Sequence, residues 1–380
     1  MSIIIVDDNA TNQMIIRTIL RKEGYNDIRI ASSAMELYDM LHIDSSAYME
    51  EQVDLILLDM MMPEIDGLEA CRRIVSDNRY RDVPIVFVTA VGDSMKLAEA
   101  LDAGATDYVM KPINKLEMLA RIRSALRLKH EKDWHRERDK RIRYELELAK
   151  QVQRSVLSPP IRNDRICMEA EYRPSSELAG DYYAWFPIDR SRYGVILLDM
   201  MGHGISSSLV CMFISSVLKD MVLRITDPEE VMQELNNRMG QLYRPTELVN
   251  FYFTAIFVLI DTENRTLQYA NAGHPAGIAV TDSSLTPLET SGPAVGLFDS
   301  IHVRQKTLSY EPGMTIVLYT DGLLDAIDVE ADEASLERIA EGVRGLPDST
   351  PGELVDHIIQ SSGEASKQRD DICMVRIQLN

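Results

Sequence analysis

The chain has 380 residues, too many for one ordinary core, because domains typically contain roughly 100–200 residues. Apolar residues make up 45% of the sequence and charged residues 26%, a mixture typical of globular rather than disordered proteins. The formal net charge of −20 would repel a phosphate backbone, and no basic recognition helix is evident. We therefore expect two domains, no nucleic-acid binding and no transcription-factor role.

Export and membrane insertion are not expected either. The first residues, MSIIIVDDN, reach two acids after a short apolar run, and no apolar run approaches the roughly 18 residues needed to cross a bilayer. The cysteines show no metal-ligand or disulfide spacing and fit reduced thiols; they are Cys71, Cys167, Cys211 and Cys373. We expect a cytoplasmic protein that does not bind membranes.

Residues 1–127 alternate short apolar runs with amphipathic helical stretches. The runs are IIIVD, IRIA, LILLD, PIVFVTA and DYVMK, and each precedes a stretch with helical periodicity. Continuous apolar strands that alternate with helices are typical of a parallel sheet covered on both faces. We predict an α/β domain built on a five-stranded, doubly wound parallel sheet.

Residues 128–157 form a different kind of segment, which contains KHEKDWHRERDKRIRYELELAKQVQRSV without glycine or proline. Strong helix formers dominate it, so we predict a long helical linker. Its downstream half carries an a/d-like apolar seam of Ile142, Leu146, Ala149 and Val156. Gln153 interrupts this seam, and the same phase upstream is polar, with Lys132, His135 and Asp139. A dimerising coiled coil and a solvated single helix both remain open.

Residues 158–380 change pattern again. Strand-like runs include YGVILLD, FYFTAIFVLID, LQYANAG, TIVLYTD and ICMVRIQL. Two helical stretches, SSSLVCMFISSVLKDMVLRI and PEEVMQELNNRMGQLY, lie together after Asp199. Grouped strands and grouped helices predict an α+β domain rather than a second doubly wound sheet.

The six letters ILLDMM occur twice, around Asp59 and around Asp199. The first copy continues as MPEIDG and the second as GHGISSS, and no further letters repeat in register. We therefore reject an internal repeat. Each copy is interpreted as a buried strand that ends in an aspartate directed at a divalent cation.

Polar residues follow four of the strands predicted for the first domain. Asp7 and Asp8 end the first strand, and Asp59 ends the third. Thr89 ends the fourth strand and Lys111 the fifth. Because the carboxyl ends of parallel strands share one sheet edge, these groups should converge. Single aspartates in such places are mostly strand-end or cap residues, but this ordered set suits Mg²⁺ and a phosphoryl group.

The motifs VDD, LLDMMMPEIDG, VTA and YVMKP resemble the response-regulator receiver family over residues 1–127. This resemblance implies that Asp59 accepts a phosphoryl group from a sensor histidine kinase. It also implies that Asp7, Asp8 and the backbone carbonyl of Met61 bind Mg²⁺ together with Asp59. One departure is the longer segment HIDSSAYMEEQ before the third strand, which we expect to extend a surface loop.

The same resemblance assigns the switch residues of the first domain. Thr89 and Tyr108 are implied to form the switch pair. Lys111 is implied to contact the phosphoryl oxygens on Asp59.

Five aspartates of the second domain lie beside glycines or at strand ends: Asp181, Asp199, Asp321, Asp370 and Asp371. Singly they would be taken for turn residues. As a set they offer hard oxygen ligands for Mg²⁺ or Mn²⁺, and the lack of His or Cys ligands argues against zinc. Two such ions roughly 3.5–4 Å apart support in-line displacement at phosphorus, so the set predicts phosphate-ester hydrolysis.

The motifs GDYY, DMMGHG, FTAIF, NAGHPAG, YTDGLLDA and DDICMV resemble the PPM metal-dependent serine/threonine phosphatases over about residues 145–379. They look most like the RsbU-like, stress-response branch, whose substrates are phosphorylated anti-sigma-factor antagonists. The segment ELELAKQVQRSVLSP resembles the helix that leads into that branch's catalytic domain. The resemblance implies a β-sandwich flanked by helices, with two or more Mg²⁺ or Mn²⁺ ions.

The resemblance also assigns the catalytic residues. Asp199 is implied to bridge both metals, and the carbonyl of Met200 to bind one of them. Asp321 and Asp370 are implied to complete the other, while Asp181 would act mainly through water on the metal. Asp371 remains the alternative to Asp370, because an adjacent pair leaves the register open.

Other residues of these motifs are not expected to bind metal or to take part in catalysis. His203, between glycines, and His274, before proline, are interpreted as loop residues rather than catalytic ones. Ala184 stands where an acid is common after GDYY, and Asp325 stands where Glu is usual after TDG. Neither departure removes an implied primary ligand. We therefore expect an active enzyme, and keep as the alternative an inactive phosphatase-like adaptor that sequesters a sigma-control protein.

The hypothesis from the sequence is a response regulator that acts as a homodimer. Its parts are a receiver (1–127), a helical linker (128–157) and a phosphatase domain (158–380). Phosphorylation at Asp59 would control hydrolysis through the linker helix.

Overall fold

The computed structural model describes residues 1–43, 52–90, 94–202, 204–242, 251–327, 333–361 and 368–380. The chain divides into two compact units, Met1–Ile142 and Arg143–Asn380, each with cores of its own. The long segment expected to extend a surface loop before the third strand falls almost wholly outside the described residues.

The first unit is built on five parallel strands in the order β2-β1-β3-β4-β5. They are β1 (Ser2–Val6), β2 (Asp27–Ala31), β3 (Leu55–Asp59), β4 (Ile85–Thr89) and β5 (Asp107–Met110). The predicted five-stranded parallel sheet is therefore confirmed. Every residue of β1, β3 and β4 is buried, as expected of strands covered on both faces.

Helices cover both faces of this sheet. They are α1 (Ala10–Lys22), α2 (Ala34–Leu41), α3 (Gly67–Ser76), α4 (Ser94–Asp102) and α5 (Lys115–Ser155). Because strand side chains alternate, Ile3 and Ile5 pack with α1 and α5, whereas Ile4 and Val6 pack with α2 and α3. The sheet is doubly wound, as the sequence predicts.

Helix α5 continues without interruption for 41 residues, and the division between the two units falls within it. Its first turns pack on the parallel sheet through Met118 and Ile122. The predicted linker helix is thus confirmed, as the continuation of the last helix of the first unit.

The C-terminal unit contains two antiparallel sheets. One has the order β14-β11-β10-β9-β8 and the other the order β13-β12-β15-β16-β7-β6. The strands are β6 (Ile161–Arg162), β7 (Ile166–Arg173), β8 (Asp181–Pro187), β9 (Arg192–Met200), β10 (Phe253–Asp261), β11 (Thr266–Ala272), β12 (Gly277–Val280), β13 (Leu285–Leu288), β14 (Lys306–Ser309), β15 (Thr315–Tyr319) and β16 (Ile372–Leu379). The predicted α+β class with a β-sandwich is confirmed.

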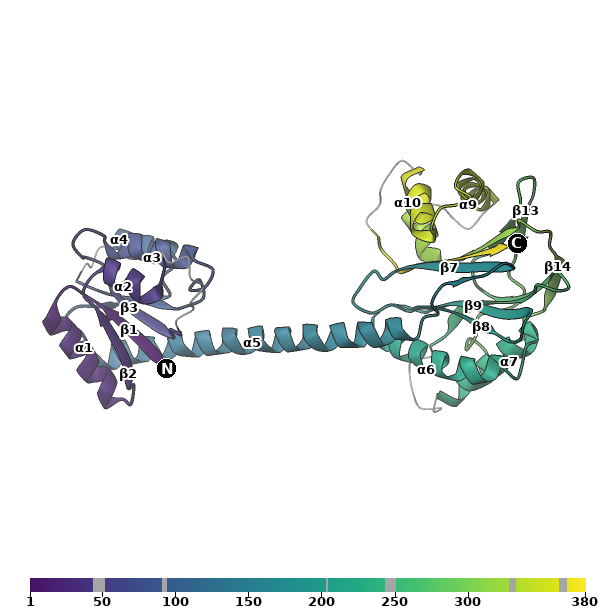
Figure 1. The fold of residues 1–380 in the computed structure, drawn as a ribbon. Helices are drawn as coiled ribbons and strands as arrows, with labels where there is room; N and C mark the ends of the chain where they lie inside the picture. Colours follow the sequence, from purple (N-terminus) through teal and green to yellow (C-terminus); the bar gives the residue numbers. More distant parts are fainter. Residues whose placement is uncertain (44–51, 91–93, 203, 243–250, 328–332, 362–367) are drawn as a thin grey trace. The chain divides into compact units, whose positions relative to one another are not determined.

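Helices flank the sandwich on both outer faces, as Figure 1 shows within this unit. The helices are α6 (Ile205–Val222), α7 (Pro228–Leu242), α8 (Asp321–Ala326), α9 (Glu333–Gly345) and α10 (Pro351–Ser361). Helices α6 and α7 pack on the sheet that holds β9, and α8 to α10 pack on the sheet that holds β16. Val195 and Leu197 of β9 face the core between the sheets, whereas Ile196 and Leu198 face α6 and α7.

Helix α6 is long and apolar enough to span a membrane by length and composition, with a mean hydropathy of 1.5 over 18 residues. The expectation that no stretch approaches this limit was therefore wrong. Its buried face, including Cys211, Ile214 and Leu218, packs on the sheet that holds β9. Packing in this core accounts for part of the apolar composition of α6.

The two ILLDMM copies occupy unrelated positions. The first forms β3 in the parallel sheet, and the second forms β9 in an antiparallel sheet. Both strands are covered on both faces, which explains why both are continuous apolar runs.

Candidate phosphorylation and metal sites

The acidic residues of the first unit meet at the carboxyl edge of its sheet. Asp7, Asp8 and Asp59 each bring a carboxylate oxygen within 4.8 Å of the others. Asp7 and Asp59 are buried, and Asp8 is exposed. Lys111 Nζ lies 2.7 Å from Asp59 Oδ2 and 2.9 Å from Asp7 Oδ2. Strand ends therefore converge as the sequence predicts.

The charges at this edge are not balanced. Burial raises the pKa of the Asp59 carboxyl, although the Lys111 ammonium and the Met61 N–H act in the opposite direction. Burial acts to lower the pKa of Lys111, but its hydrogen bonds to Asp59 and Asp7 raise it above the ordinary value. Three carboxylates thus face one ammonium, and a divalent cation with oxygen ligands fits this donor set.

Asn12 is a member of this site that the sequence analysis missed. Its Nδ2 lies 3.1 Å from each carboxylate oxygen of Asp7. The first turn of α1 places it there, because Asn9 caps the helix through the N–H groups of Thr11 and Asn12. In the sequence, the only indication of this contact is that an asparagine follows Asp7 by five residues, at the start of the predicted helix.

The expected switch residues lie on neighbouring strands. Thr89 is fully buried at the end of β4, and its carbonyl accepts the N–H of Lys111 at 2.8 Å. Tyr108 of β5 is half-buried, and the Arg121 guanidinium lies 5.6 Å from the centre of its ring. Arg121 is held by Asp107 at 2.7 Å.

In the C-terminal unit, strand register brings the first two predicted aspartates together. Asp181 opens β8 directly opposite Asp199 near the end of β9. Met200 follows Asp199 at the same strand end. Gly180 makes this approach possible, because a Cβ there would lie 2.9 Å from the carbonyl oxygen of Gly202.

The other sheet contributes the remaining aspartates. Asp321 begins α8 after β15, and Asp370 and Asp371 precede β16. Gly322 packs so closely here that a Cβ would lie 2.0 Å from the carbonyl oxygen of Asp371. The first turn of α8 therefore rests against the DD pair, and the GD, TDG and DD motifs meet at one end of the sandwich.

Thr320 links the two sheets at this point, and the sequence analysis did not identify it. Its Oγ1 donates to Asp181 Oδ2 at 2.8 Å and accepts the N–H of Cys373 at 3.0 Å. Thr320 is fully buried, and so is the carboxyl of Asp181. One hydroxyl thus fixes Asp181 relative to the start of β16.

Burial and mutual repulsion define the electrostatics of this site. Burial, together with Asp321 and Asp370, raises the pKa of Asp199 to about 8. The pKa of Asp321 is raised by burial and then by Asp370 and Asp325, and the pKa of Asp181 is raised well above its usual range, first by burial. The donor set fits divalent cations, which would stabilise the ionised forms.

Asp199 lies at the centre of these carboxylates, since its side chain is hydrogen-bonded to Asp181 and to Asp321. Among the described residues, three acids with oxygens all within 4.8 Å of one another occur only at Asp7, Asp8 and Asp59.

The adjacent pair Asp370 and Asp371 have different surroundings. Asp371 is buried, and its carboxylate accepts three hydrogen bonds, from Ser175 N, Ser175 Oγ and Gly180 N, at 2.6, 2.9 and 2.8 Å. Asp370 is half-buried and interacts with Asp199 and Asp321. The geometry favours Asp370 as the candidate ligand. Asp371 instead holds the loop before β8, through Ser175 and Gly180.

The less favoured residues of the motifs also have defined places. His274 is buried, its Nδ1 lies 2.8 Å from Thr254 Oγ1, and burial lowers the pKa of its ring to about 3. His203 lies outside the described residues. Ala184 is buried under α6, whereas Asp325 is exposed near Asp321.

Two family models match the chain. One, described as Response regulator receiver domain, matches residues 3–123. The other, described as Stage II sporulation protein E (SpoIIE), matches residues 189–380, half of the chain. The chain belongs to the SpoIIE family. It combines an N-terminal receiver domain with a SpoIIE domain of the PPM phosphatase type.

Curated relatives match in two blocks. Phosphoserine phosphatase RsbP of Bacillus subtilis (strain 168) is 35% identical over 239 residues, which are 62% of this chain and 58% of RsbP. Transcriptional regulatory protein YvrH of the same organism is 40% identical over 126 residues, 33% of this chain and 49% of YvrH. The chain thus spans about half the length of these relatives. The likeness to YvrH is confined to a third of the chain.

A solved structure shares the fold of the SpoIIE domain. The SiaA-PP2C domain of Pseudomonas aeruginosa is similar with a TM-score of 0.53 and 21% identity, over 64% of this chain and 98% of that domain. At this identity the likeness supports the fold alone.

Proposed function

We propose that this protein is a cytoplasmic, metal-dependent phosphoprotein phosphatase controlled by phosphorylation of Asp59 in its receiver domain. The observation that carries the proposal is the meeting of Asp181, Asp199, Asp321 and Asp370 at one end of the SpoIIE sandwich. The identity to a phosphoserine phosphatase supports it. The proposed substrate is a phosphoserine or phosphothreonine of an anti-sigma-factor antagonist.

The residues of the site would divide the work. Mg²⁺ or Mn²⁺ would offset the charge of the phosphate ester and lower the pKa of the attacking water. Asp199, Asp321 and Asp370 would hold the ions, with the carbonyl of Met200 as a further ligand. Asp181 would orient a water molecule at the metal site, since Thr320 fixes its carboxylate through a 2.8 Å hydrogen bond.

The decisive experiment measures hydrolysis of a chromogenic phosphomonoester and of a phosphoserine protein. We expect turnover with Mn²⁺, loss of turnover with a chelator, and recovery when Mn²⁺ is restored. Asp199→Asn should reduce turnover by two orders of magnitude or more, because it removes a charge that holds a metal. Asp189→Asn is the matched control, since Asp189 is a surface residue of the same unit that pairs with Arg192.

The alternative is an inactive adaptor that sequesters a sigma-control protein. A parent protein that binds the antagonist but hydrolyses neither substrate with either metal would support the adaptor. Full activity in Asp199→Asn would contradict the assignment of the site.

The receiver input is proposed to come from a sensor histidine kinase, with Mg²⁺ bound by Asp7, Asp8 and Asp59 and the carbonyl of Met61. The 2.7 Å contact between Lys111 Nζ and Asp59 Oδ2 supports a role of this ammonium in holding the phosphoryl oxygens. Thr89 and Tyr108 would report the phosphoryl group to the surface of the receiver. The output would run along α5, since this helix begins in the receiver unit and ends in the phosphatase unit.

A further inference from the structure

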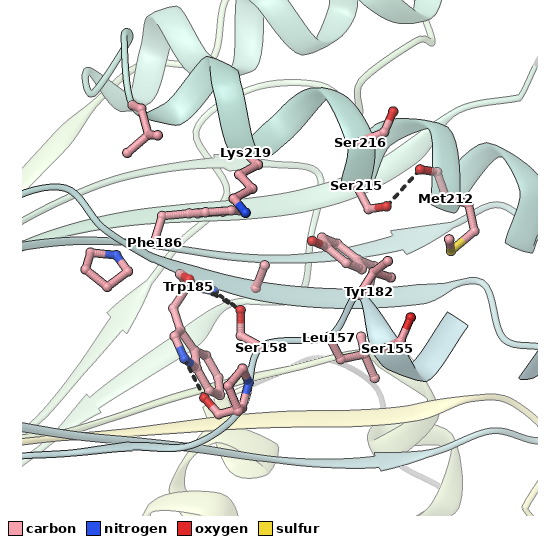
Figure 2. A pocket seen from close by; sticks show the side chains of 15 residues that line it. Ser155, Leu157, Ser158, Tyr182, Trp185, Phe186, Met212, Ser215, Ser216 and Lys219 are labelled. Carbon is pink, nitrogen blue, oxygen red and sulfur yellow. Dashed lines mark hydrogen bonds between the residues drawn. The ribbon is translucent and has the colours of Figure 1, made fainter. Parts of the chain in front are cut away.

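A cavity of about 630 Å³ lies in the SpoIIE domain, and none of the candidate metal ligands lines it. Its walls come from the segment that follows α5, from β8 and from α6 (Figure 2). Aromatic and aliphatic side chains line most of it, namely Leu157, Tyr182, Trp185, Phe186, Met212 and Leu223. This volume lies within the range of about 300–1,000 Å³ that is typical of small-molecule sites.

The polar groups of the cavity are few and mostly engaged. The hydroxyls of Ser215 and Ser216 each donate to a carbonyl of their own helix at 2.7 Å. The indole N–H of Trp185 donates to the carbonyl of Pro159 at 2.9 Å. The two serine hydroxyl oxygens can still accept a hydrogen bond from a ligand, whereas the indole N–H of Trp185 is already used.

Lys219 is the one charged residue among the described residues that line the cavity. Figure 2 shows its ammonium reaching from α6 toward Phe186. Its side chain is exposed, and no ion pair of Lys219 occurs in the described part of the chain. An apolar chamber with a single cation at its wall is complementary to a ligand with an apolar body and one negative end.

We propose that this cavity binds an amphipathic carboxylate. Its apolar body would pack against Tyr182 and Trp185, and its carboxylate would pair with Lys219. The chain carries a net charge of −20, but screening at physiological salt limits long-range repulsion to about 8 Å, so the local ion pair decides the affinity. The ligand would take no part in phosphate hydrolysis.

The fluorescence of Trp185 provides a direct test. The chain has two tryptophans, so Trp134→Phe leaves Trp185, inside the cavity, as the single emitter. Titration with decanoate in this background should change the emission saturably. Adding Lys219→Met should weaken decanoate binding roughly two- to fivefold, as expected of an exposed ion pair, without changing the response to decanol. Lys150→Met, a lysine outside the cavity, should leave the decanoate affinity unchanged.

Three results would overturn the proposal. The first is a Trp185 emission that does not change when decanoate is added. The second is an equal decanoate affinity with and without Lys219→Met. The third concerns another occupant. If Ser215→Phe, which fills the cavity, halved the mass in sedimentation, the cavity would be a contact between two copies of the chain rather than a ligand site.

Discussion

Two neighbouring aspartates show how a single residue's surroundings decide its task. Asp370 interacts with Asp199 and Asp321, while Asp371 accepts hydrogen bonds from Ser175 and Gly180. The same chemical group is thus left available for a cation at one position and fully engaged with the backbone at the next.

Asp370→Asn and Asp371→Ala should fail in different ways. Asp370→Asn should lower turnover and weaken the response to Mn²⁺ with little change in Tm, because it removes charge from the candidate metal site. Asp371→Ala should lower the free energy of unfolding by about 1.5–3 kcal/mol, because the buried N–H of Gly180 and the N–H of Ser175 lose a carboxylate partner. Urea unfolding and turnover at saturating Mn²⁺ separate the two. A stable Asp371→Ala protein would contradict the structural task.

The residues that the sequence revealed and those that it concealed differ in a physical way. Asp59 and Lys111 follow apolar strands of a parallel sheet, so one rule about strand ends brings them together. Thr320 has its partner Asp181 139 positions away across two sheets. Neither the local periodicity nor the spacing of motifs indicates how the two sheets lie against each other. The role of Thr320 therefore could not be predicted from the sequence.

At the scale of elements, the end of α5 departs from the sequence interpretation. Gln153 was interpreted as a break in an apolar seam, but it is buried and paired with the backbone of Ala179. Its Nε2 lies 2.7 Å from the carbonyl of Ala179, and its Oε1 accepts the N–H of the same residue at 3.2 Å. Val156 on the same seam packs into the core beside α6.

This contact gives α5 a direct connection to the candidate metal site. Ala179 precedes Gly180, whose N–H binds Asp371, and Gly180 precedes Asp181. A change in the position of α5 would therefore move the backbone of Ala179, two residues before the candidate ligand Asp181. The periodicity of the sequence correctly predicted the helix, whereas the partner of a glutamine on it could not be predicted, because that partner is a backbone group 26 residues away.

Gln153→Ala should uncouple the phosphatase from its receiver. The backbone groups of Ala179 would lose their partner inside the protein, at a cost of about 1–3 kcal/mol in stability. The turnover ratio with and without beryllofluoride should fall to one, while Gln151→Ala, at an exposed position of the same helix, should keep the parent ratio. An unchanged ratio in Gln153→Ala would exclude this route.

The whole molecule combines a candidate phosphorylation site and a candidate hydrolytic site in one chain. In the described part of the chain, the linker seam packs into the SpoIIE core at its C-terminal end, through Val156. Ile142 is exposed and Leu146 is half-buried, so both could contact a second copy. We therefore retain the homodimer as a proposal, with activation on phosphorylation as its expected direction.

Acetyl phosphate should label the parent at Asp59 and leave Asp59→Ala unlabelled. Among the described acids, only Asp59 and Asp7 pair with Lys111 Nζ, the group expected to hold the phosphoryl oxygens.

Beryllofluoride should raise both the turnover and the sedimenting mass of the parent. Leu146→Glu should abolish the change in mass. Equal labelling of Asp59→Ala would disprove the phosphoacceptor, and a mass and turnover that both ignore beryllofluoride would disprove the coupling.

Because α5 is uninterrupted, the number of residues in it sets the rotation of everything beyond an insertion. Each residue added to an α-helix turns everything beyond it by about 100°, so seven added residues nearly restore the original phase. Alanines inserted between Asp139 and Lys140, both exposed, should therefore change the receiver's control of turnover periodically: lost with two, regained in large part with seven. Control that decayed steadily with insert length would mean that α5 acts as a tether. Control that followed the phase would mean that the helix transmits torque.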